Sequence, residues 1–481
     1  MDLPNSCGVR VYRPRCVETR RRATAGGDGD KLAGMETPTE STLAERSGLP
    51  DGLLAEAVEL LTRLATQSSP SDDPQALRRM AGALATELGA RGLTVAIHDE
   101  PDEQGVALPV VEAHAPAHGG RGAHLPLLLI GHFDTVLSAA RPRLEGGRLF
   151  ATGAIDMKGG IVTFLKALDL LARRGVTLPA LRLVLVPDEE VGGAISRRAV
   201  ATAGAAARAL WVLEPGERRG AGESLVTGRR GMFHWQLAAR GRTAHSGLAF
   251  WQGRSALVAA AEWIERVAAL SRPDGGPTVN VARFVAGEAG FVAALAPGAP
   301  TSSGASGASG ASRPSVPGPG DAAGALFGTA HQLNVVPDRA LAEGEARFLR
   351  APEAENLARE MAALAAEIAA RRQVAIEFTR EAAVAPVDPA ALPRAHADRA
   401  VALAAAAGWE LVREDDRGGI SFPNFLEQPG RIPVLDGLGP VGGGMHTRDE
   451  HVELESLARR IRLLADLLQS EAPAGATASA G

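Results

Sequence analysis

The chain has few cysteines, no long apolar run and little net charge. Its 481 residues include only two cysteines, Cys7 and Cys16, which both lie near the N-terminus. The remaining sequence therefore has no disulfide framework and no thiolate metal site. No apolar run approaches the roughly 20 residues that span a bilayer. The net charge is −5, with acids and bases interspersed, which argues against a nucleic-acid or membrane partner.

The first 50 residues lack apolar periodicity and the hydrophobic segment of a secretory signal. We expect a disordered tail over residues 1–50, with Met35 as a second candidate start, and a cytoplasmic protein. Hydrophobic residues make up 45% of the chain. That fraction can fill the two cores that a chain of this length requires.

Short apolar runs alternate with helical patterns over most of the chain. The runs are LPLLLIG, LRLVLVP, ALWVLEP and IPVLDGLGP, and the segment KGGIVTFLKALDLLARRGV places its apolar residues on one helix face. This alternation predicts an α/β domain with a mainly parallel sheet covered by helices. We assign residues 51–227 and 383–470 to this domain, and residues 471–481 to a second disordered tail.

The segment between the two parts of the α/β domain has a different pattern. Alternating and helical stretches follow one another as β-α-β-β-α-β, which predicts an inserted ferredoxin-like α+β domain over residues 228–382. Within it, residues 290–328 are dominated by Gly, Ser, Pro and Ala. Such a tract buries too little apolar surface to order itself, so we expect a flexible loop there.

Residues that can bind a metal stand at or after the end of each apolar run of the α/β domain. They are His132 and Asp134 after the first run, Asp188, Glu189 and Glu190 after the second, Glu214 at the end of the third, His446 after the fourth, and Asp156 just before the first long helix. Ligands of open α/β sheets bind outside the carboxyl ends of the strands. We therefore expect these side chains to converge on one crevice.

The donor types indicate a metal site. Imidazoles and carboxylates without thiolates suit Zn²⁺, and also Co²⁺ or Mn²⁺. Without a cation, so many carboxylates in one crevice would repel one another. Two divalent ions about 3.5–4 Å apart would relieve this repulsion. With five ligand residues, each ion has three ligands only if one residue bridges the two ions. Of the pair Glu189–Glu190, one carboxylate can bind metal while the other takes a proton from water.

Each of these residues has an ordinary structural explanation when it is taken alone. A His-x-Asp after a strand is usually a loop cap or an ion pair, and two adjacent glutamates are usually solvated. Glu214 before Pro215 would be an ordinary turn residue. Their recurrence at the ends of four apolar runs, in two residue classes that both bind such metals, favours the metal site.

Six blocks together resemble the di-zinc metallopeptidases that include glutamate carboxypeptidase, acetylornithine deacetylase and succinyl-diaminopimelate desuccinylase. The blocks are GHFDTV, GAIDMKGG, PDEEVGG, GRTAHSG, NVVPDRALAEGEARF and LDGLGPVGGGMHTRDEHVEL, in the order of that family. The resemblance extends over about residues 50–470. The last block most resembles the glutamate carboxypeptidase branch.

The resemblance implies roles for the strand-end residues. It implies two sets of metal ligands that share a bridging carboxylate, namely His132, Asp156 and Glu214 for one ion, and Asp156, Glu190 and His446 for the other. Asp134 then orients His132, as metal-bound histidines usually require. Glu189 is the general base, and the peptide bond after Asp156 is cis.

The resemblance also implies roles for residues of the inserted domain. His245 matches a histidine that helps to bind the tetrahedral oxyanion, and Arg347 and Asn280 match residues that hold the carboxylate end of the substrate. His234 matches nothing and is interpreted as structural. Members of the family commonly dimerise through this domain, so we expect a homodimer in which His245 completes the site of the partner chain.

One position departs from the family pattern. The glutamate carboxypeptidase branch usually has Gly-Gly-x-Ser-Asp-x-Asn-Phe where this chain has GGISFPNF, so Phe422 replaces an aspartate while Ser421 and Asn424 remain. This departure leaves the metal ligands in place. It bears on the substrate pocket, and therefore on the identity of the substrate, while the metal centre is untouched.

Together, the residues and the resemblance predict a carboxypeptidase-like, metal-dependent hydrolase. Its expected reaction is cleavage of an amide bond next to a free carboxylate, by a water that two metals activate and Glu189 deprotonates. One alternative is an N-acyl-amino-acid deacylase of the acetylornithine deacetylase or desuccinylase type. A second alternative is a non-catalytic peptide-binding protein on the same fold, which the complete set of ligands and base disfavours.

Overall fold

The structure is a computed structural model that describes residues 48–115, 125–294 and 333–472. Cys7, Cys16, Met35 and most of both expected tails lie outside these ranges, as does most of the tract 290–328. Helix α7 (Ala289–Ala294) occupies the start of that tract, so the loop prediction is wrong for residues 290–294. The Glu288 carboxylate explains this helix, because it accepts the backbone N–H groups of Gly290 and Phe291 at 2.8 and 2.7 Å.

The largest sheet has six strands in the order β1-β2-β6-β3-β7-β15. Strands β6, β3, β7 and β15 are parallel, whereas β1 and β2 form an antiparallel edge beside β6. The bounds are β1 (Thr94–Pro101), β2 (Ala107–Ala115), β3 (Leu127–His132), β6 (Leu181–Val186), β7 (Ala209–Val212) and β15 (Val434–Leu435). The prediction of a mainly parallel sheet is confirmed.

The register of the central strands positions the candidate site. All six residues of β3 are buried, as expected for a strand whose two faces are both covered. His132 lies opposite Val186 of β6, and Ile130 lies opposite Val212 of β7. The three strands therefore end at the same edge of the sheet, and the segments that follow them diverge from one place.

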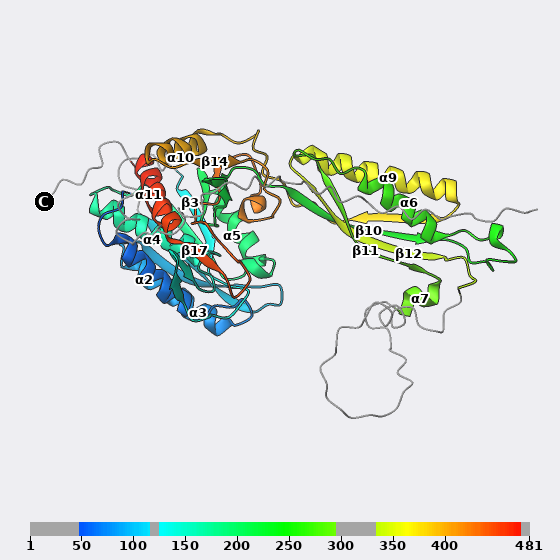
Figure 1. The fold of residues 1–481 in the computed structure, drawn as a ribbon, viewed down its shortest axis with the longest axis horizontal. Coiled ribbons are helices and arrows are strands. Elements are labelled where there is room, and N and C mark those ends of the chain that lie inside the picture. Colours follow the sequence, from blue (N-terminus) through cyan, green and yellow to red (C-terminus); the bar gives the residue numbers. More distant parts are fainter. Residues whose placement is uncertain (1–47, 116–124, 295–332, 473–481) are drawn as a thin grey trace, which may run out of the picture. The chain divides into compact units, whose positions relative to one another are not determined.

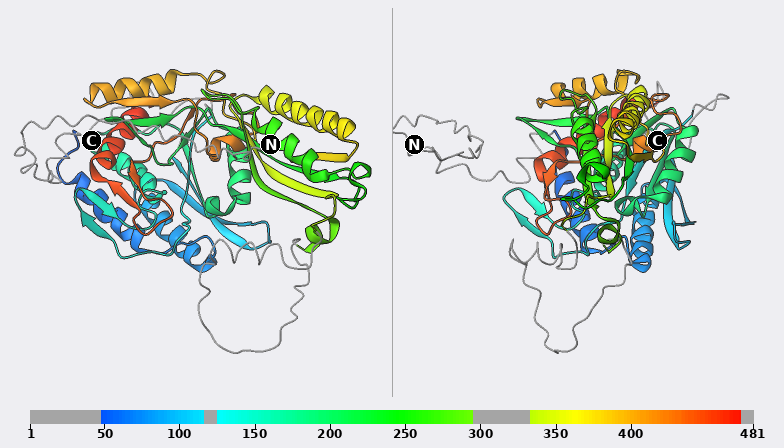
Figure 2. Two further views of the ribbon diagram at one scale, coloured as in Figure 1. Left: turned by 45° about the vertical axis from the view of Figure 1, so that its right-hand side comes forward. Right: turned by 90° about the vertical axis from the view of Figure 1, so that its right-hand side faces the viewer.

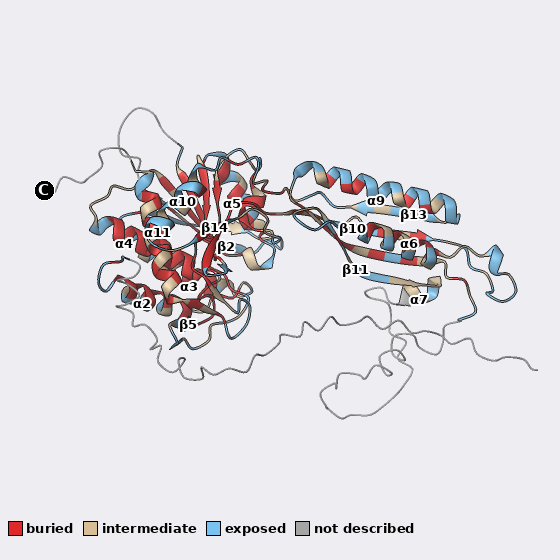
Figure 3. Cartoon of the chain, turned by 45° about the horizontal axis from the view of Figure 1, so that its top comes forward, coloured by how far each residue is buried: buried red, intermediate tan, exposed pale blue. Residues whose placement is uncertain are grey.

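Helices cover this sheet on both faces. The helices α4 (Lys158–Arg173), α11 (Leu454–Ser470) and α2 (Leu53–Thr66) pack together, and α4 contacts β3, while α5 (Ala194–Ala205) packs on β3 and β6 from the other side (Figures 1 and 3). Helix α3 (Pro74–Gly89) packs on β1 and β2, and α10 (Ala395–Ala406) packs on α11. Apolar residues at helical spacing on the inner faces explain this packing.

Two small sheets flank the main one. The first has the order β14-β9-β8 and the second the order β16-β17-β5-β4. Their strands are β4 (Arg143–Glu145), β5 (Arg148–Phe150), β8 (Arg218–Arg219), β9 (Gly222–Val226), β14 (Leu411–Glu414), β16 (Gly442–Gly443) and β17 (His451–Glu453). Short 3₁₀ turns are η1 (Glu189–Val191), η2 (Phe250–Gln252) and η3 (Phe422–Phe425). The second sheet joins the segment before Asp156 to the segments on both sides of His446.

The inserted segment forms an antiparallel sheet of four strands in the order β11-β12-β10-β13. The strands are β10 (Gly231–Arg240), β11 (Thr278–Gly287), β12 (Arg339–Phe348) and β13 (Ala375–Arg380), and Figures 1 and 2 show α6 (Ala256–Ala268) and α9 (Ala351–Arg372) side by side on one face. This is the ferredoxin-like arrangement that the sequence predicts.

The six-stranded sheet and the inserted sheet each have a hydrophobic core of their own. One core gathers residues from Leu49 to Leu225 and from Val387 to Leu468, and the other gathers residues from Phe233 to Ile368. Burial is dense in the central strands β3, β6 and β7 of the six-stranded sheet, whereas much of β11 and β13 is exposed (Figure 3). In the described ranges, no helix combines the length and apolar character needed to cross a lipid bilayer.

Two glycines allow α4 to begin close to the strand ends. A Cβ atom added at Gly160 would lie 1.9 Å from the carbonyl oxygen of Leu213, and one added at Gly159 would lie 2.4 Å from that of Ala154. Both distances are far below any van der Waals contact. The first turn of α4 therefore packs directly on the backbone just before Glu214, which explains the pair of glycines after Lys158.

Candidate metal centre

His132 lies at the centre of the cluster of predicted ligands. It ends β3, is fully buried, and its backbone N–H points to Met157 Sδ at 3.1 Å. Its Nε2 atom lies 3.0 Å from Asp156 Oδ1 and 3.8 Å from Glu214 Oε1. The cluster thus joins a strand end, the turn before α4 and the segment after β7.

Asp156 faces the two histidines with its two oxygens. While Oδ1 contacts His132, Oδ2 lies 3.3 Å from Nε2 of His446, and the same Nε2 lies 3.0 Å from Glu190 Oε2. The peptide bond between Asp156 and Met157 is cis, as the resemblance implies. A carboxylate with one oxygen toward each histidine has the arrangement that a bridging ligand requires.

His446 differs from His132 in its surroundings. Its side chain is 52% exposed, and its backbone has a φ of 62°, in the left-handed region that non-glycine residues seldom adopt. One candidate ligand is thus held inside the protein and the other stands at the entrance of the cluster.

Two groups of three residues each have possible ligand atoms that all lie within 4.8 Å of one another. They are His132, Glu189 and Glu214 in one group, and His132, Asp156 and Glu190 in the other. These groups hold all the carboxylates of the predicted sets, but they share His132 instead of Asp156, and they add Glu189. His446 belongs to neither group, although it contacts Asp156 and Glu190. The division into two three-ligand sets therefore stays a prediction.

The charges of the cluster fit a divalent cation. Burial raises the pKa of Glu214 well above its usual value, and raises that of Glu190 to about 8, with Asp156 adding to the shift. Burial also acts on Asp156, but hydrogen bonds from His132 and His446 outweigh it and hold the pKa of that carboxyl well below its usual range. Without cations the cluster holds protons in their place, which is the behaviour of a metal site.

Asp134 is buried and connects His132 to the glutamate pair. Its Oδ1 lies 3.3 Å from Nδ1 of His132. Its carboxylate also accepts the backbone N–H groups of Glu189 and Glu190 at 3.3 and 3.2 Å, and the hydroxyl of Ser71 at 2.8 Å. The backbone carbonyl of Asp134 also lies 3.2 Å from the same Nδ1, so this one residue fixes the orientation of the histidine and the position of the two acids. Ser71 has no sequence signal that marks it as part of the site.

Glu450 is a second residue that the sequence analysis did not identify. Its buried carboxylate accepts the backbone N–H groups of Gly153, Ile155 and Asp156 at 2.8, 3.1 and 3.2 Å. It lies between His446 and β17, so it ties the segment that carries His446 to the turn that carries Asp156. The only signal was its place in the block MHTRDEH, four residues after His446.

Family comparison agrees with this geometry. Residues 128–470 match the model of the peptidase family M20/M25/M40. The chain belongs to this family. Membership makes it a metal-dependent hydrolase, and it confirms the resemblance drawn from the sequence.

Relatives of this M20 chain extend over different shares of it. Carboxypeptidase G2 of Pseudomonas sp. (strain RS-16) is 24% identical over 422 residues, 85% of this chain and 88% of that protein. A probable carboxypeptidase of Aspergillus terreus (strain NIH 2624 / FGSC A1156) is 32% identical over 235 residues; these are 44% of this chain and about half, 52%, of that relative. The crystal structure of aminopeptidase PepT from Bacillus cereus ATCC 10987 has a TM-score of 0.66 at 19% identity, covering 87% of this chain and 98% of that one. This last likeness concerns the fold.

Phe422 lies near His132, one of the predicted ligands of this M20 chain. Its side chain is fully buried, and its ring centroid lies 6.4 Å from that of His132. The predicted ligands stay in place, and the effect of this departure on the substrate pocket stays a prediction. An apolar ring thus packs beside His132 at the position where the resemblance implies an aspartate. Ser421 and Asn424 instead hold the turn η3, because Asn424 Oδ1 accepts the Ser421 N–H at 3.1 Å.

His245 makes its hydrogen bonds within the inserted domain. Its Nδ1 accepts the backbone N–H groups of Gly247 and Leu248 at 3.1 and 3.2 Å, and its Nε2 lies 3.2 Å from Nδ2 of Asn334. The ring is exposed. Among the described residues, none of its hydrogen-bond partners belongs to the metal cluster, so the structure does not bring His245 to that site within one chain.

Arg347 and Asn280 lie on neighbouring strands of the inserted sheet. Asn280 stands opposite Glu345, and the Arg347 guanidinium forms two hydrogen bonds to the Glu345 carboxylate at 2.9 and 3.0 Å, with a third to the carbonyl of Gly418 at 2.6 Å. The charge of Arg347 is thus already paired. Asn280 is exposed, and its side chain forms no such contact with any described residue.

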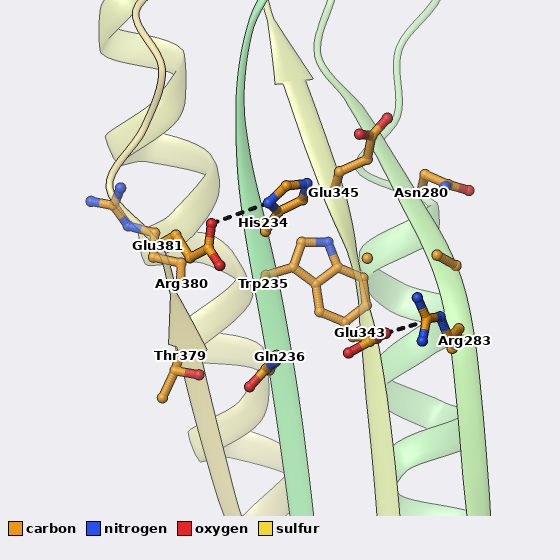
Figure 4. Close-up of a pocket in the computed structure, with 12 residues that line it drawn as sticks. His234, Trp235, Gln236, Asn280, Arg283, Glu343, Glu345, Thr379, Arg380 and Glu381 are labelled. Atoms are coloured by element: carbon orange, nitrogen blue, oxygen red, sulfur yellow. Dashed lines mark hydrogen bonds and ion pairs between the residues drawn. The ribbon is translucent and has the colours of Figure 1, made fainter. Parts of the chain in front are cut away.

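A hollow of about 480 Å³ lies on the inserted sheet, next to Asn280 (Figure 4). Its charged side chains are largely paired: Arg283 with Glu343 at 3.1 Å, and His234 with Glu381 at 3.1 Å. The pairing of His234 agrees with its structural interpretation. The hollow contains none of the predicted metal ligands, so its size alone does not make it the active site.

Proposed function

We propose that this M20 hydrolase is carboxypeptidase-like and cleaves an amide bond next to a free carboxylate. The observation that carries the proposal is the position of Asp156, whose two oxygens lie 3.0 and 3.3 Å from His132 and His446. Glu189 lies in the same cluster. This combination of a bridging acid and a neighbouring base is what two-metal hydrolysis of an amide requires.

The proposal assigns two divalent ions to the cluster. His132, Asp156 and Glu214 would hold one ion, and Asp156, Glu190 and His446 the other. Zn²⁺ is the ion proposed, with Co²⁺ or Mn²⁺ as substitutes, because the donors are imidazole nitrogen and carboxylate oxygen. When bound, such ions supply Lewis-acid chemistry at the carbonyl and at the attacking water.

Glu189 is the proposed general base. Burial raises the pKa of its carboxyl, which suits a group that must both accept and return a proton near neutral pH. It would take the proton of the attacking water and give it to the leaving amine. Asp134 supports both histidine and base, since its carboxylate contacts the His132 ring and the backbone N–H of Glu189.

The inserted domain, residues 228–382, is proposed to act as a lid and to form a homodimer. Leu248 and Trp251, which follow His245 closely, are 86% and 87% exposed. Phe250 is also exposed and its ring centroid lies 5.1 Å from that of Trp251, and adjoining exposed apolar residues, unlike single ones, often mark an interaction surface. We propose that the partner chain covers them and that His245 reaches the partner's site, where it binds the oxyanion.

Arg347 and Asn280 are retained as proposed contacts for the substrate carboxylate. Because Glu345 already pairs with Arg347, this role requires the substrate to replace Glu345 as a partner. The other proposed contacts do not depend on it.

A substrate panel tests the proposal. Metal-loaded protein is offered dipeptides, the same dipeptides as C-terminal amides, and N-acyl amino acids, and release of the free amine is followed. The proposal expects cleavage of the free acids and much slower cleavage of the amides. If the rate of cleavage depends on the acyl group and not on the amino acid, the result would instead support the deacylase alternative. Absence of cleavage together with tight peptide binding would support the non-catalytic alternative.

A further inference from the structure

Arg197 lies in the first turn of α5, shortly after the Glu189–Glu190 pair. Asp188 fixes this turn, because its carboxylate accepts the backbone N–H groups of Ile195 and Ser196 at 2.7 and 3.0 Å. The same carboxylate also accepts the Ser196 hydroxyl at 2.6 Å. The position of Arg197 relative to Glu189 is therefore set by a short, hydrogen-bonded segment.

A cavity of about 410 Å³ lies beside Glu189, and Arg197 lines it. Much of the remaining wall is apolar, from Met232, Val384, Ile420 and Phe425. A cavity with apolar walls and few polar groups has the character of a small-molecule binding site. Its contact with Glu189 connects it to the proposed reaction.

The guanidinium of Arg197 has no acidic partner within the described ranges. Its Cζ atom lies over the ring of Phe425, 5.6 Å from the ring centroid. The neighbouring Arg198 differs, since it pairs with Glu100 at 3.5 Å and bonds the carbonyl of Pro101. Glu381 also lines the cavity but pairs with His234. Arg197 is thus a cation whose hydrogen-bond donors remain free for a ligand.

We propose that Arg197 is a specificity-determining residue that binds an anionic group of the substrate in this cavity. The inference rests on the proposed function, and it narrows the substrate class to amides that carry a carboxylate at the end of an apolar stem. The planar guanidinium binds such a group with two parallel hydrogen bonds. The apolar walls receive the stem, and the bound anion sits beside the base.

Kinetics on two matched pairs of dipeptides test this role. The pairs are Ala-Glu with Ala-Gln, and Glu-Ala with Gln-Ala, which differ only by a carboxylate or an amide on the same stem. Arg197→Ala should lower kcat/KM for the carboxylate member of one pair by about 10–100-fold, the usual effect of losing a hydrogen bond to a charged group. Its amide counterpart should change by less than about threefold, and Arg197→Lys should retain part of the preference.

Arg198→Ala is the matched control, because it removes the same side chain one residue away and should leave both members of each pair unchanged. Circular dichroism and thermal unfolding of each variant confirm that it is folded. Equal losses on the carboxylate and amide members, or no loss on either, would overturn the role of Arg197.

Failure of the proposed function is distinguishable, because wild-type protein would then cleave none of the four dipeptides. In that event, calorimetric titration with the same dipeptides replaces the kinetics. Wild type should bind a carboxylate member more tightly than its amide counterpart, and Arg197→Ala should lose that preference. Equal binding of both members by wild type would overturn the inference.

Discussion

Glu189 and Glu190 are neighbours in the same 3₁₀ turn, yet we propose different chemical roles for them. Glu190 contacts His446 at 3.0 Å and is a proposed ligand, while Glu189 is the proposed base. Glu189→Gln keeps the shape and hydrogen bonding of the side chain but cannot accept a proton. We expect kcat to fall on the order of 10²–10⁴-fold with metal content near that of wild type.

Glu190→Gln is the matched control, and it should lose metal as well as activity. Metal content is measured by elemental analysis after gel filtration. If Glu189→Gln loses metal and Glu190→Gln keeps it, the two roles are reversed.

The protons that the metal-free cluster holds give a second prediction. Hydrogen bonding to Asp156 raises the pKa of His446 to about 9, and burial raises that of Glu190 to about 8. At about pH 7 both groups are protonated, so a metal ion must displace these protons. Proton release on Zn²⁺ binding should therefore decrease, and metal affinity should increase, as the pH rises to about 9.

Calorimetric titration with Zn²⁺ in buffers of different ionisation enthalpy measures this release. A release that stays constant from about pH 6 to about pH 9 would contradict the assignment of His446 and Glu190 as ligands.

The sequence points to the proposed ligands but not to the residues that hold them in place. His132, Asp156 and Glu214 stand at strand ends or before a long helix, where a pattern can locate them. Ser71 reaches the site from a loop and donates its hydroxyl to the carboxylate of Asp134. Glu450 stands just before β17 and accepts backbone N–H groups of the segment before Asp156, which is far away in sequence. No local periodicity encodes such contacts.

At the level of single elements, the first turn of α4 depends on a glycine at a position with no room for a side chain. Gly160→Ala would place a Cβ atom 1.9 Å from the carbonyl oxygen of Leu213, next to Glu214. We expect the backbone to shift, with a loss of about 1–3 kcal/mol in the free energy of unfolding and weaker metal binding.

Gly82→Ala is the control, because Gly82 lies inside α3 with open space where the Cβ atom would be. That substitution should stabilise the protein by about 0.5–1 kcal/mol, the usual preference of a helix for alanine. Urea unfolding of both variants measures the difference. A Gly160→Ala variant as stable as Gly82→Ala would show that the close approach of α4 to Leu213 is not present.

Elements with strong periodicity were predictable, and those without it were not. Strand β3 is a continuous apolar run, and α4 has a clear apolar face. Strand β1, TVAIHDEP, is mostly exposed, so neither an apolar run nor an alternation marks it as the edge of the main sheet. Helix α7 was missed because six residues are too few to show a helical period.

In the whole molecule, we propose that His245 of one chain lies in the metal site of its partner. His245→Ala and Glu189→Gln should each be nearly inactive alone, since loss of an oxyanion donor typically costs roughly 10²–10³ in rate. Mixed under conditions that exchange subunits, the two variants should recover up to about a quarter of wild-type activity. Half of randomly paired dimers are mixed, and each mixed dimer has one intact site of two.

Analytical ultracentrifugation establishes the dimer, and fluorescence exchange between labelled subunits establishes mixing. Lack of recovery despite exchange would mean that His245 acts within its own chain or has no catalytic part. Such a result would leave the metal cluster unaffected, because none of its proposed ligands comes from the inserted domain.

In the proposed reaction, a two-metal cluster built on Asp156 carries out the hydrolysis of the amide. The most direct measurement is a titration of chelator-treated protein with Zn²⁺, Co²⁺ or Mn²⁺ that follows dipeptide hydrolysis and bound metal together. We expect no hydrolysis by the metal-free protein. We expect full activity to return as the bound metal approaches two ions per chain. Asp156→Asn, which keeps the size of the bridging side chain, should not recover at any metal concentration in this titration. Full activity of the metal-free protein would contradict the account.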